Sequence, residues 1–523
     1  MDAVQLSIFS NRIDAICSEM GVTLQHAAFS PNIRDRLDYS CAIFDETGEL
    51  CAQAAHIPVH LGSMAYAMRD LAGRFDWREG DMVVLNDPYK GGTHLPDVTL
   101  IAPVFINNEL SGFVANRAHH ADIGSDTPGS MPLSTCLQEE GLVIEPCLLV
   151  RDDEVIDDIF CELMSSMRNP QESTGDFIAQ VAANRRGVQR LISLIGGMGL
   201  DSYRASLDSL NDYARRLASR SLADIPDGCY HFEDFMDGDG VDGDGVGDDE
   251  GGRAIAIRVA ITVAGEDIHV DFSGTSPQVN GNINCPISVT AAAVYYVFRC
   301  LMPPQTPACA GSFAGIDISA PGSSLVNATY PAAVAAGNVE TSTRIVDVVL
   351  GALSRVIPER IPAASHGSMN NLAMGSAGDV SHAAWDYYET IGGGMGASQV
   401  GDGLDAVQTH MTNTLNTPIE SLEMMYPLRI IRYALRTDSA GRGRHDGGEG
   451  VHREYQFLQD ARFTLLTERR IHAPWGLAGG GDARRGENLL NGQVLPGKVS
   501  RHVRAGDVLT ISTPGGGGYG KQA

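Results

Sequence analysis

Two clusters of histidine and aspartate, His94–Asp97 (HLPD) and His119–Asp122 (HHAD), begin 25 residues apart in the chain. Imidazole nitrogens and carboxylate oxygens together bind divalent zinc, manganese or iron. A histidine or aspartate at the end of a strand more often forms only hydrogen bonds with a neighbouring loop. Four such residues that converge would instead create a metal site, so the segment between the two clusters decides which reading holds.

That segment has the pattern of a β-hairpin. Residues 98–105 (VTLIAPVF) are apolar and rich in strand formers, residues 107–109 (NNE) form a polar turn, and residues 112–116 (GFVAN) read as the return strand. If the turn is centred near Asn108, Asp97 faces His119 across the hairpin, and His94 faces Asp122. The sequence therefore predicts a divalent-metal site at this strand end.

A second hairpin is predicted just upstream, with strands at 40–44 and 49–53 around a turn at 45–48. Asp35 and Asp38 precede it and are further candidate ligands. By the same pairing argument, Asp38 would lie near His56. His56 and His60 are weaker candidates, which could equally support the ligands from outside or belong to the core.

The chain has 523 residues, which is too long for one compact core and predicts two or more domains. We place a boundary near Ile225. Residues 1–225 would form a strand-rich metal-site region followed by helices, and residues 226–523 a second α/β region with a Gly-rich C-terminal segment. The expected class is α+β, or mixed α/β, with several antiparallel sheets and flanking helices.

Apolar spacing and turn residues predict the individual elements. A strand is expected at 82–85, and a further hairpin at 254–263 and 268–272. Beyond residue 365 we expect Gly-rich loops and short strands. Helices are expected at 2–20 (ending at Gly21), 174–194, 201–223, 288–301 and 340–356.

Composition excludes several functional classes. The net charge of −27 opposes binding to nucleic acid, which requires lysine and arginine to neutralise phosphates, and it opposes adsorption to anionic lipid. No apolar stretch approaches the roughly 18–20 residues of a membrane span, and no signal peptide is visible. We therefore expect a cytoplasmic protein that binds a small-molecule substrate. The ten cysteines form no CxxC pair and are expected to be reduced, mostly buried residues.

Two motifs resemble nucleotide-binding loops without meeting their requirements. Gly238, Gly240 and Gly243 form GxGxxG, but they lie in an Asp/Gly run (234–252) with no strand–helix frame. The run also fails the calcium-binding EF-hand pattern, because Val241 occupies the third ligand position, so a solvated loop is expected. Residues 515–521 (GGGGYGK) fit GxxxxGK, but Gln522 follows and leaves no room for a helix. If ATP is used, another chain is expected to bind it.

The Gly-rich segments 392–396 and 515–520 have two readings. They could form tight structural turns, or they could let the backbone approach a substrate or a partner closely. Serine-hydrolase (GxSxG) and zincin (HExxH) motifs are absent from the sequence.

The same residues carry a family resemblance that covers nearly the whole chain. The sequence resembles the hydantoinase B/oxoprolinase family, which includes N-methylhydantoinase B-type subunits, the C-terminal half of 5-oxoprolinase, caprolactamase and the large subunits of acetone and acetophenone carboxylases. The matching segments, in chain order, are 30–45, 56–64, 86–105, 116–125, 175–184, 270–284, 387–397, 401–403, 411–420, 474–481 and 513–520.

The resemblance implies a divalent metal (manganese, zinc or iron) held by His94, Asp97, His119 and an upstream carboxylate. That carboxylate falls on Asp35, with Asp38 as its rival, although relatives often have glutamate there. The resemblance also implies a partner, a hydantoinase A-type subunit with an actin-like ATPase fold that binds ATP. Heterotetramers of two A-type and two B-type chains are common in the family.

The expected reaction is ATP-dependent hydrolysis of a cyclic amide such as a hydantoin, 5-oxoproline or a lactam. The partner would phosphorylate the amide oxygen, and water activated at the metal would open the ring. His120 or Asp122 would move the proton, or would orient His94 and His119 from outside. One alternative is ATP-dependent ketone carboxylation on the same site. Another is a scaffold subunit that only organises the ATPase, which the intact cluster disfavours.

Overall fold

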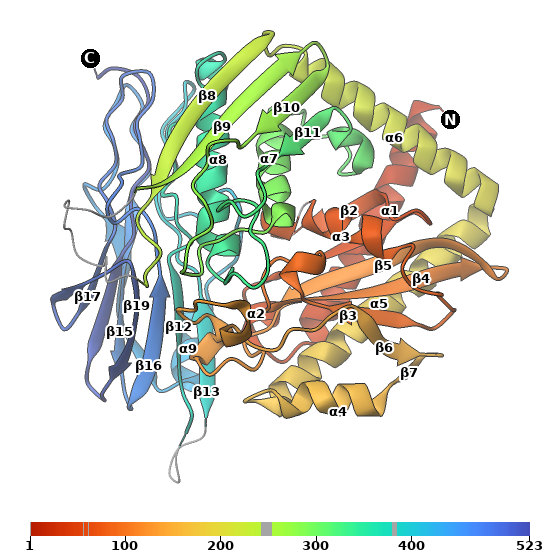
Figure 1. The fold of residues 1–523 in the computed structure, drawn as a ribbon, viewed down its shortest axis with the longest axis horizontal. Coiled ribbons are helices and arrows are strands. Elements are labelled where there is room, and N and C mark those ends of the chain that lie inside the picture. The colour runs from red at the N-terminus through yellow and green to blue at the C-terminus, as the bar shows by residue number, and fades with distance from the viewer. Residues whose placement is uncertain (1, 56, 61, 242–253, 379–383, 523) are drawn as a thin grey trace.

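The computed structural model describes residues 2–522 apart from residue 56, residue 61 and the segments 242–253 and 379–383. These residues form four β-sheets flanked by helices (Figure 1). Within each sheet neighbouring strands are antiparallel, except that β10 and β11 are parallel. The predicted α+β class, with several antiparallel sheets and flanking helices, is therefore confirmed.

The first sheet is seven-stranded, in the order β2-β1-β5-β4-β3-β6-β7. Apolar clusters cover both of its faces: one contains side chains of the long helices α1 and α5, and the other contains side chains of α3. Burial on both faces explains why β4 reads as a continuous apolar run. The strands are β1 (Tyr39–Phe44), β2 (Leu50–Ala55), β3 (Met82–Leu85), β4 (Asp97–Ile106), β5 (Glu109–His119), β6 (Cys147–Arg151) and β7 (Glu154–Val155).

The predicted strand at 82–85 and the hairpins β1–β2 and β4–β5 are confirmed. The predicted end of the first helix at Gly21 is wrong, because α1 continues to Ala27. Met20 and Leu24 are fully buried on either side of this glycine. Their burial outweighs the cost of about 1 kcal/mol for glycine inside a helix.

The remaining helices include all the others that we predicted. A π-helical turn, Gly337–Thr341, leads directly into α8, so the helix expected at 340–356 begins with irregular backbone. The helices are α1 (Ala3–Ala27), α2 (Pro31–Arg34), α3 (Ser63–Leu71), α4 (Asp157–Ser165), α5 (Pro170–Met198), α6 (Leu200–Leu222), α7 (Ile287–Leu301), α8 (Ser342–Leu353) and α9 (Ile419–Met425). None of the described helices is long and apolar enough to cross a membrane.

The second sheet has the order β11-β10-β9-β8, and α7 and α8 lie beside it (Figure 1). Its core side chains pack in one cluster with those of the two helices. The predicted hairpin at 254–272 forms β9 and β10. The strands are β8 (Gly228–Met236), β9 (Ile255–Ala264), β10 (Asp267–Asp271) and β11 (Ile316–Ser319).

The third and fourth sheets share one apolar cluster, so they pack face to face as a β-sandwich at the C-terminal end of the chain. Their orders are β13-β12-β16-β19 and β14-β15-β20-β17-β18. The segment after residue 365 therefore holds two complete sheets. The strands are β12 (Asn371–Ser376), β13 (Trp385–Glu389), β14 (Leu428–Arg436), β15 (Gly450–Phe457), β16 (Ala461–Leu466), β17 (Glu487–Leu490), β18 (Gln493–Leu495), β19 (Lys498–Val503) and β20 (Val508–Ser512).

The Gly-rich segments pack their backbones against each other. A Cβ atom built on Gly447 would lie 1.8 Å from the carbonyl oxygen of Gly516, and one on Gly516 would lie 2.0 Å from that of Met395. One on Gly394 would lie 1.9 Å from the carbonyl oxygen of Gly448. The glycines thus allow close contact within the fold, which favours the structural reading of these segments.

The Asp/Gly run does not begin as the solvated loop that we predicted. Asp234 and Asp239 are buried. Asp234 pairs with Arg469, and Asp239 accepts a hydrogen bond from the backbone of Gly281. Charge partners and backbone donors from distant segments, which composition does not reveal, compensate for this burial. Gly243 and the rest of the run lie outside the described residues.

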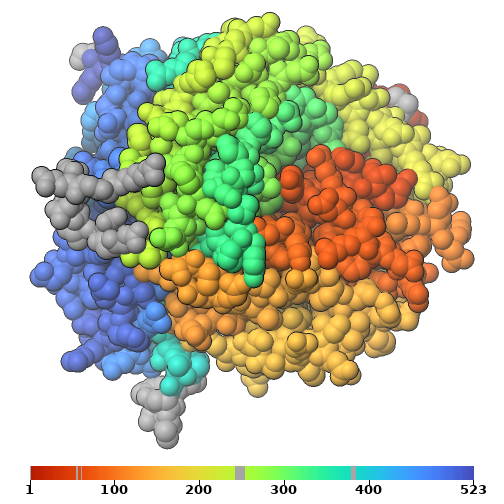
Figure 2. Space-filling model, viewed as in Figure 1, coloured from red at the N-terminus to blue at the C-terminus, as the bar shows by residue number. Residues whose placement is uncertain are grey.

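The two regions separated at Ile225 are in close contact. One apolar cluster combines Ile57, Val59 and Met131 with Ile225 and with the core of the second sheet. On the face in Figure 2, the early (red and orange), middle (green) and late (blue) parts of the chain form one continuous surface. The boundary near Ile225 stays a prediction.

Half of the ten free cysteines are buried, and three are exposed.

Candidate metal centre

The β4–β5 hairpin places Asp97 opposite His119, as the sequence predicts. Asn107 and Asn108 both adopt positive φ angles, of 51° and 65°. Two consecutive left-handed residues form the tight turn that matches the twist of a hairpin, and asparagine accepts this conformation readily. The turn pairs Ile106 with Glu109, and an extra residue in β5, Ser111, then shifts the register by one so that Asp97 faces His119.

His94 joins them by a different route from the one we expected. The predicted contact between His94 and Asp122 is not formed, because the ladder ends at the Asp97–His119 pair. Beyond it, the carboxylate of Asp122 accepts hydrogen bonds from the backbones of Arg168 and Asn169. The backbone N–H of Asp97 instead donates to the carbonyl of His94 at 3.1 Å, and this turn brings the two side chains together.

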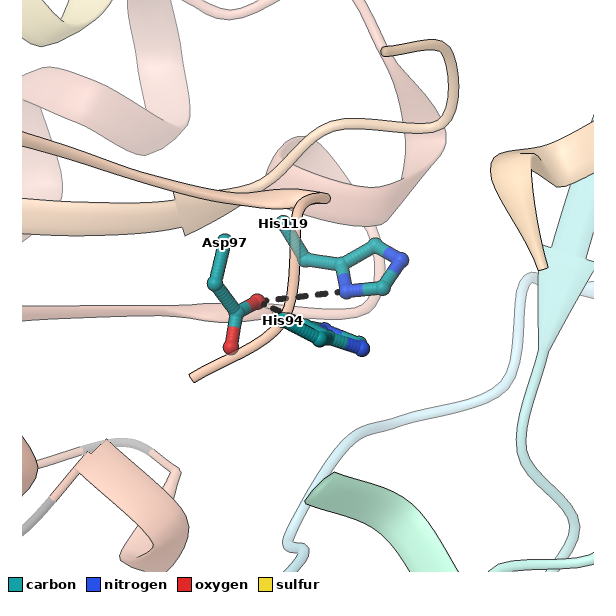
Figure 3. Close-up of side chains that lie close together, drawn as sticks. All are labelled: His94, Asp97 and His119. Carbon is teal, nitrogen blue, oxygen red and sulfur yellow. Dashed lines mark ion pairs between the residues drawn. The ribbon is translucent and has the colours of Figure 1, made fainter. Parts of the chain in front are cut away.

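His94, Asp97 and His119 converge so that their candidate ligand atoms all lie within 4.8 Å of one another (Figure 3). Asp97 Oδ1 lies 3.2 Å from His94 Nε2 and 3.3 Å from His119 Nδ1. The three residues are only 0 to 3 % exposed. Two histidines and one carboxylate match the ligand sets of catalytic zinc and of non-haem iron.

The hydrogen-bonding state of the two histidines fits a bound metal. Nε2 of both His94 and His119 is buried and forms no hydrogen bond of good geometry among the described residues, although the charge of Asp97 Oδ1 lies beside Nε2 of His94. Nδ1 of His94 lies 3.3 Å from the carbonyl oxygen of Ala335, which can accept its proton and leave Nε2 free as a ligand. Buried polar atoms are rarely left unpartnered, so a metal ion here would satisfy both.

The second oxygen of Asp97 is held by residues around the triad. Thr93 Oγ1 donates a hydrogen bond of 2.5 Å to Asp97 Oδ2, and Asn338 Nδ2 donates one of 3.3 Å. His60 Nε2 lies 3.4 Å from the same oxygen, and its Nδ1 lies 2.9 Å from Ser40 Oγ. These contacts hold the Asp97 carboxylate so that Oδ1 faces His94 and His119.

The electrostatics keep Asp97 ionised. Burial opposes its charge, but the adjacent His94 and hydrogen bonds from His119 and His60 hold the pKa of Asp97 well below its ordinary value. Burial tends to lower the pKa of His94, yet the Asp97 charge raises it overall. Burial lowers the pKa of His119, which favours the neutral imidazole that binds metals.

Tyr388, on β13, extends the site into the C-terminal half of the chain. Its ring stacks on His119, with 4.7 Å between ring centroids and 13° between planes, and the guanidinium carbon of Arg36 lies 4.8 Å from the Tyr388 ring centroid. The Tyr388 hydroxyl donates to Asn371 Oδ1 at 2.6 Å, and Asn371 Nδ2 donates to Glu340 Oε1 at 2.7 Å. This chain of buried contacts fixes the plane in which His119 lies.

The cavity at the centre is small, at about 20 Å³. This volume fits one ion or one water molecule and is far below the roughly 300 Å³ of the smallest ligand pockets. The lining residues are Asp38, Ile57, Val59, His60, His94, Asp97, His119, Asn338, Val339, Met369, Tyr388, Thr390 and Thr412.

The two candidate upstream carboxylates lie in different places. Asp35 directly follows α2, its carboxylate pairs with Arg34 at 3.0 Å, and it does not line the cavity. Asp38 lines the cavity, and its carbonyl oxygen accepts a hydrogen bond from the His119 backbone. The ligand role of Asp35 stays a prediction, and the geometry favours its rival. His56 lies outside the described residues.

His120 and Asp122 are buried but do not line the cavity. Successive side chains of a strand alternate between its faces, so His120 points away from His119. His120 Nε2 contacts Gln180 Oε1 at 2.9 Å, and its ring packs on Phe177 of α5. Asp122 binds backbone N–H groups ahead of α5. These contacts give both residues a structural role, and their predicted part in proton transfer remains untested.

Sequence reasoning missed Thr93, Asn338 and Tyr388. Thr93 directly precedes the HxxD motif, so a search for hydrogen-bond donors beside each predicted ligand would have found it. Asn338 and Tyr388 have no such signal, because Asn338 is separated from Asp97 by 241 positions.

Comparison with known proteins finds relatives that match nearly the whole chain. The family model described as hydantoinase B/oxoprolinase matches residues 2–522. 5-Oxoprolinase 1 of Arabidopsis thaliana is 39 % identical over 99 % of this chain, which spans 42 % of that longer protein. A protein of Pseudomonas sp. (strain NS671) that is named as the B-type subunit of a D-/L-hydantoinase is 33 % identical, and the match covers 99 % of this chain and 90 % of the relative.

Solved structures show the same fold. The ATP-dependent caprolactamase of Pseudomonas jessenii superposes with a TM-score of 0.88 at 27 % identity, covering all of this chain and 91 % of that one. Acetone carboxylase gives the same TM-score at 18 % identity, covering 98 % and 76 %, which is a likeness of fold. From the match along its whole length, the chain belongs to the hydantoinase B/oxoprolinase family.

Proposed function

We propose that this chain is the metal-binding subunit of an ATP-dependent hydrolase of cyclic amides, such as hydantoins, 5-oxoproline or lactams. The observation that carries the proposal is the buried convergence of His94, Asp97 and His119 with unpartnered histidine nitrogens. Relatives named as 5-oxoprolinases and a hydantoinase subunit, and the caprolactamase fold, support the substrate class.

ATP would bind to a partner rather than to this chain, whose sequence contains no functional nucleotide-binding motif. We propose a hydantoinase A-type ATPase as that partner, in a heterotetramer of two A-type and two B-type chains. Two observations support this: one relative is named as the B-type component of a hydantoinase, and this chain matches only 42 % of the much longer 5-oxoprolinase 1.

The chemistry requires two steps because an amide carbon is a poor electrophile. Transfer of the γ-phosphoryl group from ATP to the amide oxygen would give ADP and an imidate phosphate with a good leaving group. Addition of one water to the ring carbon and cleavage of the C–N bond would release the ring nitrogen as its leaving group and leave an acyl phosphate. A second water would then displace phosphate and give the ring-opened carboxylate. A divalent metal held by His94, Asp97 and His119 would supply Lewis-acid activation of water near neutral pH.

The residues of this chain would hold that centre in place and keep it dry. Asp97 stays ionised between the two histidines, and Thr93 and Asn338 fix its orientation. Tyr388 covers one face of His119. His120 and Asp122, which we predicted to move the proton, would act through contacts with α5 and the loop before it.

The test is phosphate release by the chain purified with an A-type partner. Release coupled to ring opening, and indifferent to bicarbonate, would support the hydrolase. Turnover only with a ketone plus bicarbonate would replace it with the alternative, ketone carboxylation. His94→Ala should abolish turnover while the complex stays assembled. The control His269→Ala should keep turnover, because His269 is a half-exposed residue of β10 that does not line the cavity. An active His94→Ala enzyme would refute the metal chemistry.

A further inference from the structure

A buried carboxylate outside the metal cavity takes no part in the reaction proposed above. Glu140 follows the short 3₁₀ turn Leu137–Glu139 and is 0 % exposed. No lysine or arginine pairs with it within the described part of the chain, and burial raises its pKa to about 7. Burying a carboxylate without a cationic partner costs free energy, so the hydrogen bonds that it forms indicate its purpose in the fold.

Glu140 holds a segment that lies far away in the sequence. Its Oε1 atom accepts hydrogen bonds from Ser134 Oγ at 2.8 Å and from the backbone N–H groups of Val334 and Ala335 at 2.8 and 2.9 Å. Val334 is separated from Glu140 by 194 positions. Hydrogen bonds to a carboxylate are stronger than those between neutral groups, so this oxygen fixes the backbone at Ala335.

The carbonyl group of Ala335 selects the position of the proton on His94. A neutral imidazole carries one proton, either on Nδ1 or on Nε2. Nδ1 of His94 lies 3.3 Å from the carbonyl oxygen of Ala335, and Nε2 lies 3.2 Å from Asp97 Oδ1. A proton on Nε2 would occupy the nitrogen that a metal needs. A proton on Nδ1, donated to Ala335, leaves the lone pair of Nε2 free.

The segment that Glu140 holds also contacts a second residue of the triad. Asn338 belongs to this segment, and its Nδ2 donates to Asp97 Oδ2 at 3.3 Å. The intervening backbone N–H groups, at 336 and 337, donate to the carbonyl of Asn282 at 2.9 and 3.1 Å. A shift of the segment would therefore disturb two ligands of the triad at once.

We infer that Glu140 is a positioning residue of the metal centre, which holds Ala335 so that its carbonyl takes the His94 Nδ1 proton and leaves Nε2 for the metal. Glu140 does not line the cavity, so it acts through the backbone of Ala335. The inference rests on the proposed function for the presence of a metal. It assigns to a residue of the first half of the chain the task of fixing a segment of the second half against the site.

The alternative is that Glu140 acts only by its charge, which favours a cation at His94 from a distance. Two variants separate these roles. Glu140→Gln keeps the length of the side chain and an acceptor oxygen but removes the charge. Glu140→Asp keeps the charge but is shorter by one methylene, so it cannot reach both backbone N–H groups in the same way. Positioning predicts that the glutamine variant works and the aspartate variant fails, and charge predicts the reverse.

The first measurement is zinc affinity of the full chain by competition with a chromogenic chelator. Glu140→Asp and Glu140→Ala should each weaken zinc binding by about tenfold or more, whereas Glu140→Gln should stay within about threefold of the wild type. Asp176→Ala is the matched control and should bind zinc as the wild type does. Asp176 is also a buried carboxylate that accepts from two successive backbone N–H groups, those of Phe29 and Ser30 at 2.8 and 3.0 Å, but it does not line the cavity.

The second measurement is the tautomer of His94, which a loss of stability alone would not change. It is read by NMR on metal-free protein labelled with ¹⁵N-histidine, at a pH above the pKa of His94, which Asp97 raises. The His94 signals are assigned by their loss in His94→Ala. The proton should lie on Nδ1 in the wild type and in Glu140→Gln, and it should move towards Nε2 in Glu140→Asp and Glu140→Ala.

An unchanged tautomer in Glu140→Asp would overturn the inference, whatever the zinc affinity. Weaker zinc binding by Glu140→Gln than by Glu140→Asp would also overturn it and assign the effect to charge, and an equal loss in Asp176→Ala would assign it to general stability. If Glu140→Ala does not fold, the glutamine and aspartate variants still decide. A wild type that binds no divalent metal would refute the proposed function, while the tautomer of the metal-free protein would still test this inference.

Discussion

Thr93→Val tests whether the residues around the triad hold Asp97 as a ligand. Valine keeps the shape of threonine and removes the hydroxyl that donates a 2.5 Å hydrogen bond to Asp97 Oδ2. The carboxylate would then be freer to rotate, and Oδ1 would spend less time directed at His94 and His119. We expect the variant to fold and to bind the divalent metal more weakly.

The magnitude follows from the contacts that remain. A hydrogen bond to a charged group is worth about 1.5 to 3 kcal/mol, and the outer partners of metal ligands typically contribute 10- to 100-fold in affinity. Asn338 and His60 still contact the same oxygen in the variant. The loss should therefore fall at the low end, about tenfold in Kd or about 1.4 kcal/mol. Asn338→Ala added to Thr93→Val should cost more than the sum of the single changes.

The assay is competition between the protein and a chromogenic chelator for zinc or manganese, with thermal unfolding of the metal-free protein as a check on folding. Thr290→Val is the control, because it also removes a buried hydroxyl that donates a hydrogen bond, here to the carbonyl of Val326. Thr290 lies on α7 and does not line the cavity. The reasoning is refuted if Thr93→Val binds metal as tightly as the control. It is refuted equally if both variants lose affinity to the same extent.

Three further outcomes are expected. Asp38→Asn should weaken metal binding in the same chelator assay while Asp35→Asn does not, because only Asp38 lines the cavity. The reverse result would show that Asp35 is the upstream ligand. Burial raises the pKa of Glu340 from 4.5 to about 8, so between these values only the folded chain keeps the proton. As the pH rises through this range, the unfolding free energy of the protein, measured with denaturant, should fall by up to about 1.4 kcal/mol per pH unit. Glu340→Gln should make this pH dependence weaker. Gly447→Ala, whose Cβ would lie 1.8 Å from a carbonyl oxygen, should lower stability by more than about 2 kcal/mol, whereas Gly401→Ala, with open space around it, should not.

The part of the site built by short-range geometry could be predicted from the sequence. Counting residues outward from a centre at Asn108 gives the Asp97–His119 pair, which the structure confirms. The observed turn is centred between Asn107 and Asn108, and the bulge at Ser111, which the sequence pattern does not signal, restores this register. The same counting failed for His94 and Asp122, because it assumes that the ladder continues past its last pair. His120 was chosen for its residue type, yet strand alternation directs it to the opposite face, and the pattern HHAD already contained that information.

The rest of the site depends on contacts that no local pattern encodes. The π-helical turn Gly337–Thr341 shows why: it looks like the start of an ordinary helix, and the extra residue per turn has no sequence signature. The turn nevertheless reaches the centre by two routes. Asn338 donates directly to Asp97, while Glu340 accepts from Asn371, whose oxygen holds the Tyr388 hydroxyl above His119.

These two routes give the second half of the chain a reason to be part of the metal centre. All three triad residues come from residues 94–119, so the first sheet alone could assemble the ligands. The ligands would then lack Asn338 on the carboxylate and Tyr388 on the imidazole, and water would reach both. Since a metal site depends on oriented ligands and a dry surrounding, we expect fragments that end before Gly337 to bind metal weakly even when the hairpin folds. Tight binding by such a fragment would show that the hairpin suffices.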